Sequence, residues 1–469
     1  MPQKTHYEIL VIGSGEAGKY LAWTMAKAGR EAAVVERSLI GGSCPNVACL
    51  PSKNVIYSAK VASLARRGLE FGLPTGTIDI DMNGVRARKR SMVDGLVQVH
   101  LDQYRATGTE LIMGEARFIG PKKIEVQLRE GGTVVLTGDR VFLNLGSRAS
   151  IPDVPGLREA RPLTHVEALD LDRLPQRLIV LGGGYVGLEL AQAMRRLGAH
   201  VTLVQRGPQL ARGEDPDVAE SILNVFRAEG IDVILDARTT AVRGTSGQQV
   251  NVSVQTSAAV RDLEGSDLLA ATGRTPNTQG IGLERAGVEL DSRDYIKVNE
   301  RLETTAPEVW AMGDCAGSPL FTHVAYDDYR VVRDNLLGIS RTTRDRLIPF
   351  CLFTDPELAR VGLNEKQARE RGIPYRLLKI PAKADLRTLT LSETGGFLKA
   401  LIDAHTERIL GFTGFMAEAG ELMSVVQTAM LAGMPYTTLK EQMIFAHPTM
   451  AEGLMVLFRS APQAASATA

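Results

Sequence analysis

The sequence predicts an α/β chain in which one strand–turn–helix–strand unit occurs twice, ahead of a third region that mixes strands with helices. The first copy, YEILVIGSGEAGKYLAWTMAKAGREAAVVER, covers residues 7–37, and the second, RLIVLGGGYVGLELAQAMRRLGAHVTLVQR, covers residues 177–206. Each copy reads as an apolar strand, a glycine-rich turn, an amphipathic helix and a second apolar strand. Between them, residues 115–142 alternate apolar and polar positions around turn signals, which predicts a small antiparallel meander.

Both glycine-rich turns carry the spacing G-x-G-x-x-G between a strand and a helix, the context that favours a dinucleotide site over a purely structural turn. The glycines allow a tight turn, close approach of the backbone to a pyrophosphate and close helix–strand packing. The phosphates would meet the free N–H groups at the helix N-terminus. We therefore predict two Rossmann-like dinucleotide-binding domains. The glycines are Gly13, Gly15 and Gly18 in the first copy, and Gly182, Gly184 and Gly187 in the second.

The two copies differ at the end of their second strand. The residue 23 positions beyond the first glycine is Glu36 in the first copy and Gln205 in the second. An acid at this position accepts hydrogen bonds from both ribose hydroxyls and repels a 2′-phosphate. The second copy lacks that acid and adds Arg206 and Arg212, whose guanidinium groups suit a phosphate. The first site is expected to take FAD or NAD, and the second NADPH, with NADH possible; the alternative is that both arginines are ordinary solvated side chains.

The charge balance and cysteine content exclude several classes of function. The 54 Lys and Arg residues equal the 54 Asp and Glu residues in number, so no overall field favours nucleic acid or an acidic membrane surface. No apolar segment approaches the length of a membrane span, and the N-terminal residues do not resemble a signal peptide. Four cysteines in 469 residues do not form a secreted disulfide framework. We expect a cytoplasmic protein without nucleic-acid or membrane partners.

Two of the four cysteines, Cys44 and Cys49, lie close together in GGSCPNVACLPSK, residues 41–53. A metal half-site is disfavoured because the other two cysteines stand alone and the seven histidines form no H-x-x-x-H pair, so no resident metal is expected. Two buried structural thiols and a redox-active dithiol are the remaining interpretations. Residues i and i+5 of a regular helix lie about 140° apart around the axis, which is too divergent for a disulfide. We expect Cys44 at the start of a distorted helix, Pro45 in its first turn and Cys49 about one turn inside.

This cysteine segment resembles the active-site disulfide segment of the group I pyridine nucleotide-disulfide oxidoreductases, which include dihydrolipoamide dehydrogenase, glutathione reductase and mercuric reductase. Four more segments match the family's motifs in order, so that the resemblance covers nearly the whole chain. They are the glycine turn at 13–18, ATGRTPN at 271–277, AMGDCAG at 311–317 and AHPTMAEG at 446–453.

The resemblance implies an α/β fold with Rossmann-like FAD and NAD(P) domains and a C-terminal α+β dimerisation domain. The expected boundaries are residues 1–150 for the first part of the FAD-binding domain, 151–275 for the NAD(P)-binding domain, 276–345 for the second, central part of the FAD-binding domain, 346–460 for the dimerisation domain and 461–469 for a disordered tail.

The resemblance also implies roles around the flavin. Cys44 would exchange with substrate and Cys49 would face the flavin. Lys53 would lie near the flavin and form an ion pair with Glu189, which keeps the ammonium charged and in place. Tyr185 would cover the flavin and swing aside for nicotinamide, with an ordinary packing aromatic as the alternative interpretation.

The remaining motifs complete the expected site. Asp314 would bind the ribityl hydroxyls of FAD. Glu452 would hold His447 as an acid–base pair, and because this histidine comes from the second subunit in the family, a homodimer is implied. Gly273 and Arg274 of ATGRTPN are further cofactor-binding candidates. Cys315 is interpreted as a small buried residue and Cys351 as a strand-core residue.

The function implied is a FAD-dependent NAD(P)H:disulfide-type oxidoreductase that passes electrons from NADPH through FAD to the Cys44–Cys49 pair. The acceptor stays open between a disulfide, a metal ion and an electrophile, because Pro45 and Ala48 depart from the family's usual residues. Mercuric reductase-like and dihydrolipoamide dehydrogenase activities are alternatives. A flavoprotein redox sensor that acts through a protein partner is another, although the pairing of His447 with Glu452 favours turnover.

Overall fold

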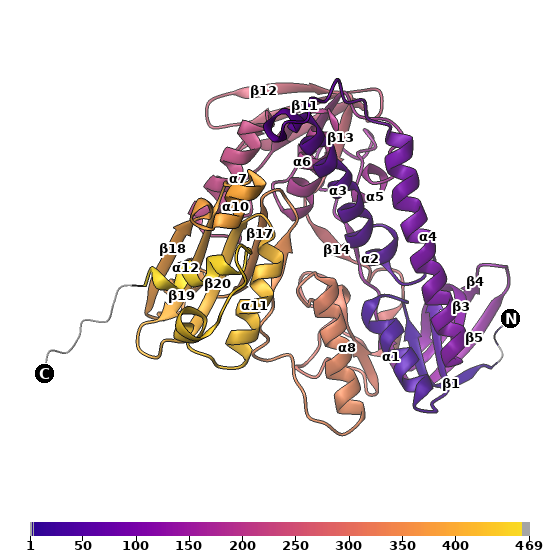
Figure 1. Cartoon of the computed structure of the whole chain (residues 1–469). Coiled ribbons are helices and arrows are strands. Elements are labelled where there is room, and N and C mark those ends of the chain that lie inside the picture. The colour runs from indigo at the N-terminus through magenta and orange to yellow at the C-terminus, as the bar shows by residue number, and fades with distance from the viewer. Residues whose placement is uncertain (1, 3, 462–469) are drawn as a thin grey trace, which may run out of the picture.

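The first glycine turn belongs to a six-stranded sheet in the computed structural model, which describes residue 2 and residues 4–461. Strand β1 (His6–Ile12), helix α1 (Glu16–Lys27) and strand β2 (Ala32–Glu36) form the first predicted unit, with β1 and β2 parallel. Strand β15 (Val309–Ala311) pairs with β5 (Thr133–Leu143) in the same sheet, and α8 (Thr322–Leu336) packs against α1. Residues far apart in the sequence therefore complete this region (Figure 1).

The predicted meander is confirmed, and it is continuous with the parallel sheet. Strand β3 (Glu110–Gly120) pairs with β2 in parallel through its first residues and with β4 (Lys123–Leu128) in antiparallel fashion through the rest. Strand β5 likewise pairs with β4 and then with β1. These two long strands run from the meander into the sheet that carries the first glycine turn.

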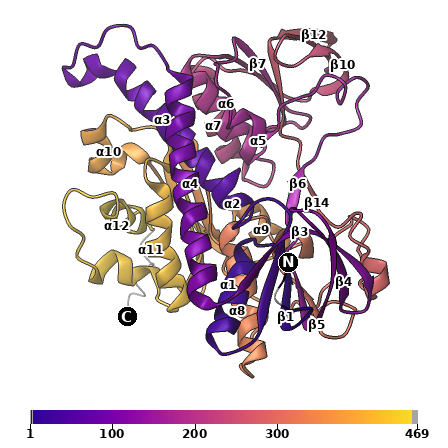
Figure 2. The ribbon, with the colours of Figure 1, turned by 90° about the vertical axis from the view of Figure 1, so that its right-hand side faces the viewer.

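The second predicted unit forms its own parallel sheet. Strands β13 (Asp267–Ala270), β7 (Arg177–Leu181), β8 (His200–Val204) and β9 (Asp232–Ile234) lie in that order, with α6 (Tyr185–Leu197) and α7 (Pro216–Ala228) between strands. An antiparallel sheet of β10 (Arg238–Thr245), β11 (Gln249–Gln255) and β12 (Val260–Gly265) packs against it, because valines of β11 share one hydrophobic cluster with residues of all four parallel strands. The short strands β6 (Ser147–Ala149) and β14 (Arg274–Pro276) pair where the chain passes between the two regions, as Figure 2 shows.

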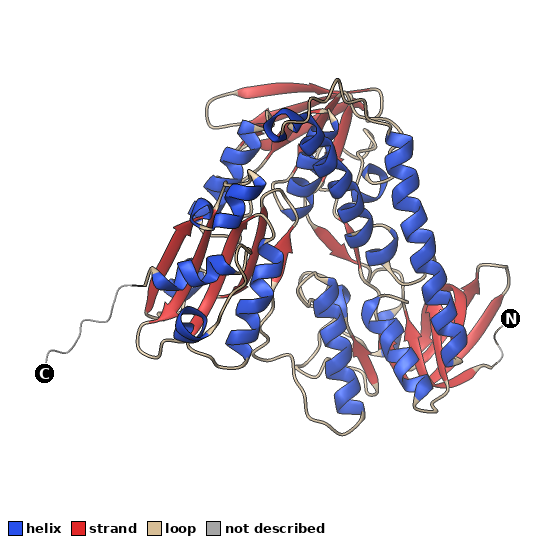
Figure 3. Cartoon of the chain, in the orientation of Figure 1, coloured by secondary structure: helices blue, strands red, loops and turns tan. Residues whose placement is uncertain are grey.

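The C-terminal region is an antiparallel sheet packed with helices, as the α+β prediction requires. The strand order is β16 (Phe350–Leu352), β17 (Glu357–Gly362), β20 (Ile409–Met416), β19 (Phe397–Asp403) and β18 (Tyr375–Pro381). Helix α11 (Ala419–Leu431) packs on β17 and β20, and α12 (Glu452–Arg459) lies against β18 and β19 (Figure 3). Ala461, assigned above to the tail, is instead buried in this core; the rest of the predicted tail lies outside the described residues.

The cysteine segment departs from the prediction of one distorted helix. A short helix α2 (Ser43–Asn46) is followed by a break, and the longer helix α3 (Cys49–Arg66) begins at Cys49 itself. At the break, Ala48 has φ −130° and ψ −104°, so that the chain turns between the two cysteines. This break relieves the divergence that a continuous helix would impose.

The long helix α4 (Met82–Thr107) packs along α3. The helical segments not yet described are short. They are α5 (His165–Ala168), α9 (Glu365–Glu370), α10 (Leu386–Leu391), and turns at Gly68–Phe71, Leu283–Ala286, Gly313–Ala316, Ala382–Ala384 and Thr438–Gln442. No helix among the described residues is long and apolar enough to cross a membrane.

Candidate active site

A cavity of about 1210 Å³ lies where the three regions meet, and much of the predicted site lines it. It extends over the first glycine turn, the ends of β2 and β5, the cysteine segment, the start of α6 and the loops around β16. The predicted residues in its wall are Gly13, Gly15, Glu36, Cys44, Cys49, Lys53, Tyr185, Glu189, Arg274 and Asp314. Those outside its wall are Gly18, Gly182, Gly184, Gly187, Gln205, Arg206, Arg212, Gly273, His447 and Glu452.

The first glycine turn is closed by protein atoms. Gly13 has φ +98°, and a Cβ there would lie 2.3 Å from the carbonyl oxygen of Asn144. A Cβ on Gly15 would lie 2.5 Å from Oδ1 of Asn144, which itself accepts a hydrogen bond from the Gly18 N–H at 3.0 Å. The protein fold alone therefore requires glycine in this turn, and Asn144 is a site residue that the sequence analysis missed.

The second glycine turn leaves its middle position open. Gly182 (φ +109°) and Gly187 lie against the backbone, since a Cβ would come within 2.3 Å of the Ala271 oxygen and 2.0 Å of the Gly182 oxygen respectively. A Cβ on Gly184 would meet nothing within 4 Å. Space beside Gly184, at the N-terminus of α6, is what the close approach of a ligand's phosphates requires.

Glu36 is a buried carboxylate that is saturated with donors. Its Oε2 accepts hydrogen bonds from the N–H and the hydroxyl of Ser14, at 2.9 and 2.8 Å. Its Oε1 accepts from the N–H groups of Ser38 and Leu39, at 2.8 and 3.0 Å. These donors fix the carboxylate at the end of β2, in the cavity wall.

The side-chain amide of Gln205 forms hydrogen bonds with the backbone of the second glycine turn and of the loop that follows β8, and pairs with no charged group among the residues that the structure describes. Its Oε1 accepts from the Gly183 N–H at 3.0 Å, and its Nε2 donates to the Gln209 carbonyl at 3.1 Å. Arg206 and Arg212 are exposed, and neither forms an ion pair or a side-chain hydrogen bond within the described part of the chain. Their guanidinium groups are available to an anionic ligand.

The two cysteines of the motif lie close enough together for each to shift the pKa of the other. A hydrogen bond from Cys44 lowers the pKa of Cys49 to about 6, and the same bond, together with burial, raises the pKa of Cys44. The hydroxyl of Thr322 lies 3.1 Å from Sγ of Cys49 and also favours its thiolate. The pair is therefore a thiolate at Cys49 held by a thiol at Cys44.

Two helix N-termini and a lysine add to the stabilisation of this thiolate. Cys49 is the first residue of α3, and Thr322 is the first residue of α8, so that the positive ends of both helix dipoles lie near the sulfur. The charge of Lys53 lowers the pKa of Cys49 further. The sequence analysis missed Thr322, whose only local signal is its place at the beginning of a helix.

Lys53 and Glu189 form the predicted ion pair. The Nζ atom of Lys53 lies 3.1 and 2.9 Å from the two carboxylate oxygens of Glu189, and 4.6 Å from the ring centroid of Phe353. The Phe353 N–H donates to Oε1 of Glu189 at 3.0 Å. An α3 ammonium and an α6 carboxylate are thus fixed to each other and to the C-terminal region.

Tyr185 lies in the cavity wall at the start of α6. Its hydroxyl donates to Oε1 of Glu214 at 2.9 Å, and its ring stacks on Phe350 with centroids 5.6 Å apart. Neither partner was foreseen from the sequence. Cys351, predicted in a strand core, does lie in β16, but it also lines the cavity; Cys315 is fully buried, as its interpretation requires.

Asp314 and Arg274 meet at Ser147. The Ser147 hydroxyl donates to the Asp314 carboxylate, and Arg274 donates to the Ser147 hydroxyl and carbonyl at 2.7 and 2.8 Å. Gly273, with φ +119°, precedes Arg274 at the start of β14. The pairing of β14 with β6 therefore positions these polar groups together.

His447 and Glu452 form a pair, but away from the cavity of their own chain. Nδ1 of His447 lies 2.9 Å from Oε2 of Glu452, and the imidazole side chain is 63% exposed. Neither residue lines the cavity, and Figures 1 and 2 both show α12 apart from α2. Within one chain, the structure does not bring this acid–base pair to the cysteines.

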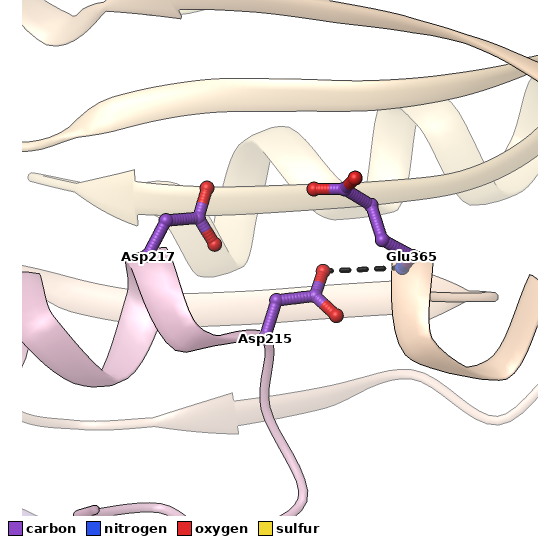
Figure 4. A group of neighbouring side chains, drawn as sticks. All are labelled: Asp215, Asp217 and Glu365. Carbon is purple, nitrogen blue, oxygen red and sulfur yellow. Dashed lines mark hydrogen bonds between the residues drawn. The ribbon is translucent and has the colours of Figure 1, made fainter. Parts of the chain in front are cut away.

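Three carboxylates gather between α7 and the C-terminal region: Asp215, Asp217 and Glu365 (Figure 4). The ammonium of Lys399 lies 2.8, 2.9 and 3.2 Å from them, and that side chain is 2% exposed. A buried lysine thus supplies the cation that such a cluster would otherwise need.

Comparisons with known proteins agree with this geometry. A family model described as pyridine nucleotide-disulphide oxidoreductase matches residues 7–328, and one described as its dimerisation domain matches residues 348–457. The chain is 35% identical over 458 residues to the probable pyridine nucleotide-disulfide oxidoreductase RclA of Escherichia coli (strain K12), covering 96% of this chain and 98% of RclA. It is 33% identical over 451 residues to a mercuric reductase of Staphylococcus aureus, covering 96% and 81%.

Among solved structures, the chain resembles a Cu(II) complex of the HOCl-induced flavoprotein disulfide reductase RclA from Escherichia coli. The TM-score is 0.89 at 34% sequence identity, and the match covers 98% of this chain and 100% of that one.

Proposed function

The chain belongs to the pyridine nucleotide-disulphide oxidoreductase family, and from that premise we propose that it transfers electrons from NADPH, through FAD, to the Cys44–Cys49 pair and on to a thiophilic metal ion such as Cu(II) or Hg(II). As a flavoprotein disulfide reductase of this family it is an oxidoreductase that uses FAD and a pyridine nucleotide. The observation that carries the proposal is the Cys44 and Cys49 pair, whose Cys49 sulfur lies 3.1 Å from the Thr322 hydroxyl and which shares one cavity with the Lys53–Glu189 pair.

The residues in the cavity wall suit FAD. The glycine turn at the N-terminus of α1 can receive a pyrophosphate, Glu36 lies in the cavity wall where a ribose hydroxyl would replace one of its present donors, and Asp314 can accept from ribityl hydroxyls. Bound there, FAD supplies the hydride and electron chemistry that links a nicotinamide to a dithiol. Lys53, held in place by Glu189, would stabilise negative charge beside it.

NADPH is the proposed reductant because the second unit has no acid that would repel a 2′-phosphate. Gln205 occupies that position, and Arg206 and Arg212 have no partner within the described residues. Two unpaired guanidinium groups can form charge-assisted hydrogen bonds with the phosphate.

The dithiol favours a soft metal ion as acceptor, because two sulfurs in hydrogen-bond contact can reach one ion, and thiolates select soft metals. The relatives include a mercuric reductase, and the structure of RclA is known as a Cu(II) complex. Two electrons from the dithiol reduce one Hg(II) to Hg(0), or two Cu(II) to Cu(I), and leave the Cys44–Cys49 disulfide with loss of the remaining thiol proton.

A disulfide is the second candidate acceptor, favoured by the His447–Glu452 pair. The Cys44 thiolate would attack one sulfur of the acceptor, and the leaving thiolate would take the proton that His447 had removed from Cys44. Cys49 would then attack Cys44, which releases the second thiolate and closes the Cys44–Cys49 disulfide. Because His447 lies outside its own chain's cavity, this step requires a homodimer, which the match to a dimerisation domain supports.

Steady-state oxidation of NADPH by the purified holoenzyme, with Cu(II), Hg(II), small disulfides and quinones as acceptors, tests the function. We expect a yellow protein with turnover on a metal ion, which the Cys44→Ser/Cys49→Ser double variant lacks. If that double variant reduces every acceptor as fast as the unaltered enzyme, the dithiol is not on the electron path. If no acceptor supports turnover, the redox-sensor alternative gains support. We also propose a cytoplasmic location, because four cysteines in 469 residues do not form a secreted disulfide framework.

Mixed dimers test the shared site. Cys44→Ser and His447→Ala chains would each be inactive toward a disulfide, but a dimer of one with the other has one complete site. Random pairing of equal amounts should restore about a quarter of the unaltered activity. A mixture as inactive as its parents, in a preparation shown to contain mixed dimers, contradicts the shared site.

A further inference from the structure

Glu214 is a buried carboxylate that holds a cavity residue and a cation from another region at once. The residue is 2% exposed. Its Oε1 accepts from the hydroxyl of Tyr185 at 2.9 Å, and its Oε2 accepts from Nε of Arg360, in β17, at 3.0 Å. One carboxylate therefore ties the first residue of α6 to the C-terminal sheet.

These three side chains close a ring of contacts with Phe350. Tyr185 stacks on one part of the Phe350 ring at a centroid distance of 5.6 Å, while the guanidinium of Arg360 lies 4.5 Å from the Phe350 centroid. Arg360 also donates to the Gly362 carbonyl and to Oε1 of Gln367, both at 3.1 Å. Tyr185 is thus held by a hydrogen bond to Glu214 and by its stack on Phe350. Arg360 contacts both of these partners and so links them.

The residues after Glu214 prevent it from moving with the tyrosine. Asp215 accepts hydrogen bonds from the backbone N–H groups of Glu365 and Lys366 at 3.1 and 3.0 Å. Both Asp215 and Asp217 pair with the buried ammonium of Lys399. A rotation of the Tyr185 ring away from Phe350 therefore breaks the hydrogen bond to Glu214.

We propose that Glu214 is a positioning residue that holds Tyr185 closed against the cavity and so sets the affinity for the nicotinamide nucleotide. The inference rests on the proposed function and on the role that the family resemblance implies for Tyr185, which must swing aside for the nicotinamide. A ligand that binds only the open form has its apparent affinity reduced by the open fraction. Loss of a hydrogen bond to a charged acceptor should raise the open-to-closed ratio about ten-fold.

Tyr185→Phe is the cleanest test, because it removes the hydroxyl and leaves both the ring stack and the Glu214–Arg360 pair. We expect the dissociation constant for NADP⁺, measured by calorimetry on the holoenzyme, and the KM for NADPH to fall about five- to ten-fold. The hydrogen bond from Tyr185 to Glu214, called the tether below, acts before hydride transfer. The change in kcat should therefore be less than about two-fold and smaller than the change in KM. Glu214→Gln, which keeps an acceptor without its charge, should change both quantities in the same direction and by less.

Tyr375→Phe is the matched control, because the Tyr375 hydroxyl donates to the Glu365 carboxylate at 3.0 Å but does not line the cavity. It should leave the NADP⁺ dissociation constant unchanged. In thermal unfolding, Tyr185→Phe and Glu214→Gln should be non-additive, since both act on one hydrogen bond.

Either of two results overturns the tether: an unchanged or raised NADP⁺ dissociation constant in Tyr185→Phe, or additive effects of the two substitutions on unfolding. The proposed function fails separately if neither NADPH nor NADH reduces the bound flavin of the unaltered protein, and the tether then fails with it.

Discussion

The two glycine turns share one fingerprint and are built for different ligands. In the first, Asn144 fills the space beside Gly15, and Glu36 accepts four hydrogen bonds from its own loop. In the second, the space beside Gly184 is open, and Gln205 replaces the acid. A closed, fully hydrogen-bonded turn suits a cofactor that stays bound, whereas an open turn suits a nucleotide that must enter and leave in each cycle.

The largest effect is expected from Glu36→Gln, which gives the first unit the glutamine that the second unit has at the equivalent position, Gln205. Glu36→Gln places an amide NH₂ where two backbone N–H groups donate, so that donors face donors and a buried charge is lost. We expect a cost of about 3 kcal/mol, or about 100-fold weaker FAD binding, from the unsatisfied donors. Flavin release on dilution, followed by fluorescence, measures it.

Glu130→Gln, on an exposed turn, is the control for that measurement and should retain its flavin. Full flavin retention by Glu36→Gln would mean that the saturated carboxylate does not distinguish the first unit from the second.

The second prediction concerns Arg206→Glu, which introduces into the second unit an acid like the one at the end of the second strand of the first unit. We expect about a 100-fold preference for NADPH over NADH in kcat/KM, since two part-exposed charge-assisted contacts each contribute about 1.5 kcal/mol. Arg206→Glu should remove most of it, chiefly through KM, because the 2′-phosphate lies far from the transferred hydride. Arg227→Glu makes the same charge change on the surface of α7 and should leave the preference intact.

Equal use of both nucleotides by the unaltered enzyme would contradict that assignment. That result would support the dihydrolipoamide dehydrogenase alternative, because the expected preference for NADPH over NADH is what separates the proposed function from it.

The third prediction compares the middle glycines directly. Gly15→Ala places a methyl group 2.5 Å from Oδ1 of Asn144, so this side chain must shift and its bond to the Gly18 N–H must weaken. A destabilisation of about 1–3 kcal/mol is expected. Gly184→Ala meets no protein atom within 4 Å, so its unfolding temperature should be unchanged while its KM for NADPH rises. Equal destabilisation by both substitutions would remove the distinction between closed and open turns.

Local patterns in the sequence identified the glycine turns, the meander, the dithiol and the Lys53–Glu189 pair, because each depends on residue type at short spacing or on a motif of the family. They missed Thr322 and Glu214, whose partners Cys49 and Arg360 lie far away in the chain. They also missed the break before α3, because Val47 and Ala48 carry no strong helix-breaking signal. Contacts between residues that are distant in the sequence, rather than local propensity, place Thr322 and Glu214.

The smallest effect is expected on the pKa of Cys49. This thiol lies next to the first unit, so substitutions in the second unit should not change its pKa. The hydrogen bond from Cys44 lowers the pKa of Cys49 to about 6. Because the folded pKa is depressed, the thiolate stabilises the reduced protein above the ordinary thiol pKa, and this contribution disappears as the pH falls through about 6. We expect the Cys49 thiolate beside bound FAD to give the enzyme, once reduced by two electrons, a long-wavelength charge-transfer absorbance, which should disappear over the same pH range.

Thr322→Val tests the finer contribution to that midpoint. The substitution removes the hydroxyl 3.1 Å from Sγ of Cys49 and keeps the side chain's shape, so the midpoint should rise by about half to one pH unit. Arg206→Glu, in the second unit, should leave the midpoint where it is. A midpoint that moves with Arg206→Glu, or one that Thr322→Val does not move, would mean that the thiolate is governed by the overall charge of the protein. The dithiol would then belong to neither unit, and the contrast between a closed cofactor site and an open nucleotide site would have to rest on the glycine turns alone.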